Sequence, residues 1–422
     1  MIKTICCCAA LFLISFSSFG QSYDIVIRNG HVIDPKNSID AVMDIGIRSG
    51  KIAAVAKKID TVNAVQVVNA DGLYVTPGLI DIHTHDFFGT EPDHYLSDGL
   101  SAIAPDGFTF RTGVTTVVDA GCSGWKNFAL FKKNIIDNSK TRILVMLNIV
   151  GDGMRGGAYE QNTGDMDGKL TGMTAMANRK IVVGIKTAHF EGHDWTAVDQ
   201  AVEAGKLANI PVMVDFGGSM PPLSIEELFM KHLRPGDIFT HCYAQLRSRE
   251  SIVDTLTWKV KPFVFEARKR GIIFDVGYGG ISFAFSQAIP ALQQGFLPNS
   301  ISTDLHTGSM NNAMKDLLNV MSKFMAMGMD FRSVINATTW NPAREIKHEE
   351  LGNLSVGAEA DIAILDLRRG KFGFFDYVGR RIEGVQKLEA EMTILGGKIE
   401  YDLNGIANPV YAPPLHPRPE IH

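Results

Sequence analysis

Short apolar segments recur near both ends of the chain, at 25–27, 42–47, 52–55, 65–68, 360–365 and 391–395. Alternation with a period of two residues is typical of strands with one buried face, and pairs such as Asn29-Gly30 favour tight hairpins. The pattern predicts a small composite β-sandwich domain, built from an N-terminal part at 21–76 and a C-terminal part at 351–404.

Between these parts the pattern changes to repeated units of an apolar strand, a loop and then a helix. The predicted strands end near His85, Asp119, Ile149, Lys186, Phe216, His241, Val276 and Thr303. Helical periodicity predicts helices between some of them, at 195–208, 225–233, 262–270 and 312–327. Eight such units predict an α/β fold, a (β/α)8 TIM barrel over 77–350, with its chemistry at the C-terminal ends of the strands.

The first twenty residues have a different character. Lys3 is followed by an apolar run through Phe16 and then by small residues. This pattern is typical of a cleaved signal peptide at 1–20, and it predicts a periplasmic or secreted protein. The run is shorter than the ~20 apolar residues that a membrane span needs, so we expect no span in the mature chain. At the other end, the proline-rich tail at 405–422 is expected to be extended.

Composition and charge narrow the range of partners. The chain has 422 residues, 45% of them hydrophobic, and a formal net charge of −5. This length suits one large barrel with an accessory domain, and the acidic balance argues against a nucleic-acid partner. We therefore expect a small-molecule substrate, while self-association into a homo-oligomer stays open. Removal of the signal would leave Cys122 and Cys242, which we expect to be free buried thiols.

The most informative chemistry is the pair His83 and His85 at the end of the first barrel strand. Residues two apart share one face of a strand, and imidazole suits zinc and neighbouring metals. Other potential ligands stand at later strand ends, namely Lys186, Asp215, His241 and Asp304. Each has a simpler interpretation, such as a surface lysine, a core histidine or a helix cap. Their convergence on one rim favours a metal site.

This order of residues, with two histidines, a lysine, an acid, a histidine and an aspartate on successive strands, resembles the amidohydrolase superfamily. The flanking segments 75–85 and 354–363 are similar to that family's first strand and to its return into the β-domain. The segments 184–186, 233–241 and 302–306 resemble its amidohydrolase/deacetylase, or dihydroorotase-like, branch.

The resemblance implies a centre with one or two divalent ions, zinc in the first place. His83, His85 and Asp304 would hold one ion and His241 the other, with Lys186 bridging both after carboxylation. Asp215 departs from the family, which has a histidine at that strand end. Aspartate can still bind zinc, or the second ion is absent. His189 and His193, in the loop after Lys186, are alternative ligands.

The resemblance also implies a reaction. We expect hydrolysis of an amide, linear or cyclic, or of an acyl ester of a small carboxylated substrate, by metal-activated water with Asp304 as general base and acid. Candidate substrate contacts are Arg155, Tyr243, Tyr278, Gly279 and Gly280, although Arg155 in a solvated loop and the glycines in a plain turn are the simpler alternatives. An isomerase, a decarboxylase and a non-catalytic binding protein of the cell envelope are the rival functions.

Overall fold

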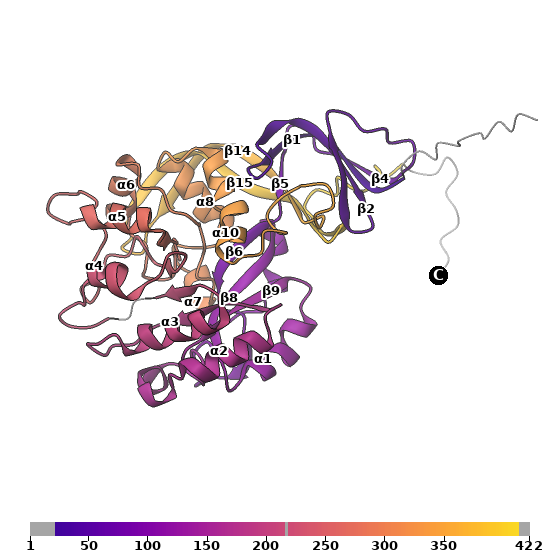
Figure 1. The fold of residues 1–422 in the computed structure, drawn as a ribbon. Coiled ribbons are helices and arrows are strands. Elements are labelled where there is room, and N and C mark those ends of the chain that lie inside the picture. Colours follow the sequence, from indigo (N-terminus) through magenta and orange to yellow (C-terminus); the bar gives the residue numbers. More distant parts are fainter. Residues whose placement is uncertain (1–21, 216–217, 413–422) are drawn as a thin grey trace, which may run out of the picture.

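The computed structural model of the protein describes residues 22–215 and 218–412. The predicted signal peptide at 1–20 and the last ten residues of the predicted tail lie outside the described residues. Figure 1 shows two parts, a strand-rich part that carries β1, β2 and β4, and a larger part with the barrel strands and most of the helices.

A curled parallel sheet forms the centre of the larger part. Seven strands are hydrogen-bonded in the order β13-β12-β11-β10-β9-β8-β6, each parallel to its neighbour. Their bounds are β6 (Leu79–Thr84), β8 (Val114–Gly124), β9 (Arg142–Asn148), β10 (Val182–Thr187), β11 (Val212–Val214), β12 (Ile238–Phe239) and β13 (Ile273–Phe274). These strands lie where the apolar pattern predicts the first seven barrel strands.

The predicted eighth strand is irregular. Segment 300–305 forms isolated parallel bridges, Asp275 with Ser300 on one side and Thr84 with Leu305 on the other. It therefore lies between β13 and β6, but among the described residues it is not a regular strand. Asp304 has a φ of 54°, a left-handed conformation that interrupts the pleat. The regular eight-stranded barrel of the prediction is thus replaced by seven strands and a bridging segment.

The inside of the curled sheet is apolar. Ile80, Ile82, Val118, Leu144 and Met146 belong to one buried cluster, which Ala343 of α10 (Trp340–Glu345) also joins. Strands buried on both faces need near-continuous apolar residues, and these strands have them.

Helices surround the sheet (Figure 1). Besides α10 they are α1 (Phe128–Asn134), α2 (Gly168–Ala177), α3 (Thr196–Ala208), α4 (Ile225–Glu227), α5 (Pro262–Arg270), α6 (Phe285–Gln293), α7 (Thr307–Met310), α8 (Leu317–Ala326) and α9 (Phe331–Asn336). A π-helical turn, Leu228–His232, extends α4. Short 3-10 turns lie at Pro105–Gly107, Phe110–Thr112, Ile136–Asn138, Gly157–Gln161 and Thr163–Asp165.

Two helix boundaries show how local chemistry sets the elements. Helix α5 has the predicted bounds, because Pro262 suits its first turn and Gly271, with φ of 100°, ends it. Helix α8 begins five residues later than predicted, at Leu317. The side chain of Asp316 accepts a hydrogen bond from the Asn319 amide and caps the helix there.

The second sheet combines both ends of the chain. Its order is β16-β15-β14-β5-β1-β2-β3, with β4 paired to β1. The strands are β1 (Tyr23–Asp34), β2 (Ile39–Arg48), β3 (Lys51–Ala56), β4 (Ala64–Asn69), β5 (Tyr74–Pro77), β14 (Ile362–Phe375), β15 (Arg381–Leu395) and β16 (Lys398–Asp402), while the short β7 (Phe88–Glu91) lies outside it. Strand β14 joins the two ends, with Ile364 opposite Val75 of β5. In their hydrogen bonding the strands form one branched sheet.

The long hairpin of β14 and β15 reaches beyond this sheet and lies along α8 (Figure 1). The amide of Leu388 donates to Ser322 Oγ at 3.0 Å.

Cys122 and Cys242 are buried and free of disulfides within the described residues, as predicted. In the same part of the chain, the structure contains no helix with the length and hydropathy that crossing a bilayer requires.

Candidate metal centre

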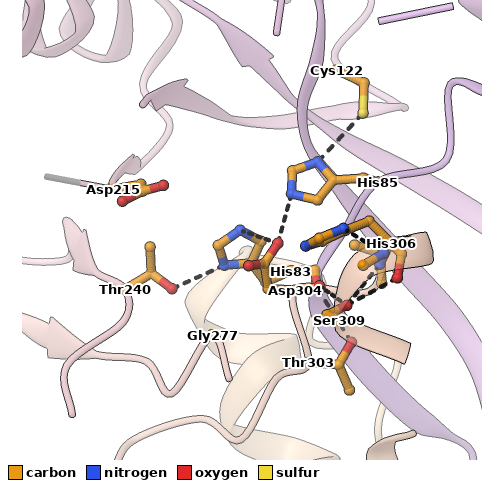
Figure 2. Close-up of polar contacts among 12 residues, drawn as sticks. His83, His85, Cys122, Asp215, Thr240, Gly277, Thr303, Asp304, His306 and Ser309 are labelled. Atoms are coloured by element: carbon orange, nitrogen blue, oxygen red, sulfur yellow. Dashed lines mark hydrogen bonds and ion pairs between the residues drawn. The ribbon is translucent and has the colours of Figure 1, made fainter. Parts of the chain in front are cut away.

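Two histidines and an aspartate meet at the C-terminal end of β6. Asp304 Oδ1 lies 2.8 Å from His85 Nε2 and 3.7 Å from His83 Nε2. One donor atom from each of the three residues can be chosen so that all lie within 4.8 Å of one another, and all three residues are buried. Figure 2 shows the two rings turned toward the Asp304 carboxylate. The strand brings the histidines together, and the bridging segment brings the aspartate.

The outer ring nitrogens of both histidines have partners of their own. His83 Nδ1 lies 2.9 Å from Thr240 Oγ1, and His85 Nδ1 lies 3.4 Å from Cys122 Sγ (Figure 2). Metal-binding histidines commonly have such a partner on the ring nitrogen that faces away from the ion. Burial, helped by the charge of Lys186, lowers the pKa of His83 to about 3, so its ring is neutral at pH 7. Two imidazoles and a carboxylate fit a divalent metal such as zinc.

Asp304 is held in a strained and highly polar position. Its left-handed backbone is stabilised by Ser309, whose hydroxyl donates to the Asp304 carbonyl at 2.7 Å. Burial alone would raise the pKa of the carboxyl, but His83 and the hydrogen bond with His85 outweigh it and hold the pKa well below its usual range. A Cβ on Gly279 would come within 2.6 Å of Asp304 Oδ2. Gly279, with φ of 63°, therefore makes room for the carboxylate.

Lys186, on β10, is fully buried rather than a surface lysine. Its Nζ lies 3.0 Å from His83 Nε2 and 3.6 Å from Met213 Sδ. Burial lowers the pKa of this amine. A Cβ on Gly121 would stand 2.7 Å from Lys186 Cγ, so a glycine on β8 allows the lysine to reach the centre.

Asp215 and His241 lie together beside this cluster. His241 Nε2 is 3.3 Å from Asp215 Oδ2, and Arg249 Nη2 is 2.7 Å from Asp215 Oδ1. Burial would raise the pKa of Asp215, but Arg249 and then His241 outweigh it, so the pKa is well below normal and the carboxylate is ionised. His189 also reaches this group, with its Nε2 3.5 Å from Asp215 Oδ2.

An open cavity of about 720 Å³ lies next to His189. Arg155, Tyr95 and Glu160 line it with His189. The Cζ atom of Arg155 lies 4.1 Å from the centroid of the Tyr159 ring. Its Nε is buried without a hydrogen-bond partner among the described residues. Burial and the charge of Asp304 raise the pKa of Tyr95 to about 12, so its hydroxyl stays protonated. Arg155 therefore lines an open cavity that His189 also borders.

The tyrosines predicted to contact substrate are directed elsewhere. Tyr243 is fully buried and its hydroxyl donates to the Phe296 carbonyl at 3.1 Å. The hydroxyl of Tyr278 donates to the Phe375 carbonyl at 2.8 Å. Both hydroxyls are occupied by main-chain carbonyls, contrary to the prediction. For Tyr243 the reason is that β12 ends at Phe239 and turns follow, so strand alternation does not extend to the tyrosine.

Sequence reasoning missed several residues of the centre. Thr240 and Asp275 support His83, and they stand directly beside predicted strand ends, where a closer reading of polar residues would have found them. Arg249, Tyr95 and Glu160 lie outside the strands and helices that the apolar pattern predicts, so no periodic signal marks them. His193, the other loop histidine considered as a ligand, lies 3.3 Å from Ser219 Oγ rather than at the cluster.

Comparison with known proteins gives a consistent picture. Residues 285–399 match a sequence model of the Amidohydrolase family. A protein named Deacetylase from Brucella anthropi is 36% identical over 340 residues, which cover 78% of this chain and 80% of that protein. A crystal structure of an adenine deaminase has a TM-score of 0.81 and 29% identity, over 90% of this chain and all (100%) of that chain. A crystal structure of a dihydroorotase has a TM-score of 0.77 and 30% identity, over 89% of this chain and 98% of that chain.

These similarities extend over both sheets and agree with the convergence of His83, His85 and Asp304 on one donor cluster. The chain belongs to the amidohydrolase superfamily and is a hydrolase.

Proposed function

We propose that the protein is a metal-dependent hydrolase that cleaves the C–N bond of an amide, linear or cyclic, or an acyl ester, in a small carboxylated substrate. The observation that carries the proposal is the meeting of two imidazoles and an ionised carboxylate at His83, His85 and Asp304. The similarity to a protein named Deacetylase supports acyl removal over other reactions of the superfamily.

His83, His85 and Asp304 would hold one zinc ion. A bound zinc ion lowers the pKa of a water molecule and polarises a carbonyl group. Carboxylation of Lys186 is part of the proposal for a centre with two ions. It is supported by the lowered pKa of the buried amine, because the uncharged amine is the form that reacts with carbon dioxide.

Asp304 is the residue that handles the proton. Its low pKa keeps it ionised at neutral pH, and Oδ1 is held by His85. Oδ2 faces the space that Gly279 leaves open. From there Asp304 takes a proton from the attacking water and passes it to the leaving nitrogen or oxygen, a transfer typically worth ~10²- to 10⁴-fold in rate.

Arg155 and Tyr95 orient the substrate. The guanidinium of Arg155 lines the cavity that His189 also borders, and its planar fork suits a carboxylate. Tyr95 lines the same cavity with a protonated hydroxyl that can donate to a substrate oxygen. A small carboxylated substrate bound there would have its scissile bond directed toward Asp304.

The test is turnover of N-acyl amino acids, acylated hydroxy acids and cyclic imides by the zinc-loaded protein, with product masses recorded. We expect one class to react with the addition of one water, and Asp304→Asn to lower the rate by ~10²- to 10⁴-fold. The absence of turnover in every class by protein with measured zinc would contradict the proposal. A product of unchanged mass, or one lighter by carbon dioxide, would instead support an isomerase or a decarboxylase.

A further inference from the structure

A second cavity, of about 570 Å³, lies between the barrel sheet and the elements packed on its outer side. Asp81 of β6 and Val117 of β8 line its sheet side, and Leu318 of α8 and Leu388 of β15 line the opposite side. It shares no lining residue with the cavity next to His189. Its volume falls in the range of ~300–1,000 Å³ that is typical of small-molecule sites. The cavity is therefore large enough for a ligand and separate from the cavity to which we assign the substrate.

Hydrogen bonds between distant segments hold the walls of this cavity in place. Thr393 Oγ1 donates to the Phe110 carbonyl at 2.7 Å and ties β15 to the 3-10 turn Phe110–Thr112. The bond from the Leu388 amide to Ser322 Oγ ties the same strand to α8. Ligand sites in proteins are usually largely preformed. A ligand would thus enter an existing space and would not have to separate a strand from a helix.

The inner part of the cavity is apolar. The buried side chains that line it are each at most 4% exposed and include Val114, Val117, Leu317, Leu318 and Leu388. Removal of apolar surface from water is favourable and roughly proportional to the area removed. This part of the cavity therefore suits an apolar chain.

Three basic residues, Arg111, Lys315 and Lys387, line the same cavity. Arg111 and Lys315 are exposed and Lys387 is half-buried, so the positive charges lie toward solvent. Within the described parts of the chain, none of these three cationic groups has a hydrogen bond or an ion pair, although Lys315 Nζ lies 5.3 Å from the centroid of the Phe375 ring. The mouth of the cavity thus carries positive charges that remain available to a ligand.

The acidic residues of the lining are already bonded. Asp81 accepts from Thr303 with both oxygens, from the hydroxyl at 2.5 Å and from the amide at 3.1 Å. Asp316 caps α8, and Glu389 is paired with Arg368 at 3.2 Å. Because the carboxylates have partners and the basic groups have none, the charge of the cavity favours an anion.

We propose that this cavity binds an amphipathic carboxylate, with its charged group at Arg111, Lys315 and Lys387 and its apolar chain between β8, α8 and β15. Thr303 and Leu305, the two neighbours of Asp304, also line the cavity. The ligand would therefore contact the segment that carries Asp304. The inference does not rest on the proposed function, because the lining contains none of the residues to which we assign metal or substrate binding.

The test is isothermal titration calorimetry of sodium decanoate, below its micelle concentration, into the full metal-loaded chain. We expect one equivalent to bind, and affinity to rise by about 4-fold per methylene from hexanoate through octanoate to decanoate. Lys387→Gln should lower the affinity by ~10-fold. Lys371→Gln, on the same hairpin but outside the cavity, is the matched control and should bind like the wild type. Decyltrimethylammonium, which pairs a similar chain with the opposite charge, should not bind.

Two results would overturn the site. Decanoate binding that is unchanged when Arg111→Gln, Lys315→Gln and Lys387→Gln are combined would show that the ligand binds elsewhere, and equal binding of decyltrimethylammonium would remove the role of charge. Arg155→Met separates this site from the substrate cavity. Unchanged decanoate affinity in that variant supports the proposal, whereas lost affinity would place the carboxylate next to His189. Either failure leaves the proposed hydrolysis standing, because turnover is measured independently.

Discussion

The Thr240 hydroxyl lies 2.9 Å from His83 Nδ1 and gives its own hydrogen to Asp275 Oδ2, at 2.7 Å. A hydroxyl has one hydrogen, so Thr240 can only accept from His83, and the proton of the ring must stand on Nδ1. The lone pair is then on Nε2, the nitrogen nearer Asp304. A threonine one residue before His241 thus determines which nitrogen of His83 is free to bind a metal.

Removal of this hydroxyl should weaken metal binding without unfolding the protein. Thr240→Val keeps the shape of the side chain but leaves His83 Nδ1 without its acceptor, so the ring loses its fixed orientation and tautomer. We expect the zinc affinity of the cluster of His83, His85 and Asp304 to fall by ~10- to 100-fold, as measured by chelator competition. Thr240→Ser, which retains the hydroxyl, should bind like the wild type, and equal affinity in the valine variant would contradict the argument.

Two adjacent glycines offer a matched test of the space beside Asp304. A Cβ on Gly279 would lie 2.6 Å from Asp304 Oδ2, whereas one on Gly280 would meet no described atom within 4 Å. Gly279→Ala must therefore displace the carboxylate, and displacements of this size cost up to ~10²-fold in rate. We expect kcat to fall strongly in Gly279→Ala and to stay near wild type in Gly280→Ala. Similar rates for the two variants would show that the close approach has no role in catalysis.

Arg155 should act on substrate binding rather than on chemistry. If its guanidinium binds the substrate carboxylate, Arg155→Met removes a charged hydrogen bond worth about 1.5–3 kcal/mol, which corresponds to about a 10- to 100-fold rise in KM. The kcat at saturation should change little. A substrate analogue with a carboxamide in place of the carboxylate should show no such difference between wild type and variant. A selective loss of kcat would assign Arg155 a different role.

Lys323 is a buried lysine that should make stability depend on pH. Burial lowers its pKa from 10.5 to about 7, and its Nζ donates to Tyr278 Oη at 3.0 Å. Between pH 7 and 10.5 the unfolded chain binds the proton more readily, so the stability of the wild type rises with pH through this window. Below pH 7 the lysine is charged in both states and its burial is most costly.

Replacement of this lysine by an apolar side chain should remove that dependence. Relative to the wild type, Lys323→Met should stabilise the protein more at pH 6 than at pH 10, by at most about 4 kcal/mol, because the roughly three units between pH 7 and pH 10 are worth ~1.36 kcal/mol each. Urea unfolding of both proteins at the two pH values measures the difference. The exposed Lys169→Met is the control and should show none. A difference between Lys323→Met and wild type that does not vary with pH would contradict the shifted pKa.

Local sequence signals predicted much of the fold. Seven parallel strands and helix α5 lie where periodicity, proline and glycine place them, since each depends on residues close together in the chain. The eighth strand was predicted from the apolar pattern alone, and the left-handed conformation of Asp304 overrides it. That conformation depends on Ser309 and on the space at Gly279, which the apolar pattern does not describe.

The candidate site likewise contains some residues that local sequence signals predict and others that depend on distant contacts. The spacing of His83 and His85 was sufficient to place two imidazoles at one strand end, because side-chain direction along a strand is a local property. The partners of Asp215 were not predictable in this way. Arg249 and His189 come from loops whose positions depend on the packing of the helices between them.

The amino-acid sequence by itself determined the kinds of donor atoms and the strand ends that carry them, because strand direction and alternation follow from neighbouring residues. Only the tertiary structure decided which donors meet, which ring nitrogens are free and which tyrosines are occupied elsewhere. Those outcomes depend on contacts between residues such as Thr240 and His83, which lie 157 positions apart and are brought together only when the sheet curls.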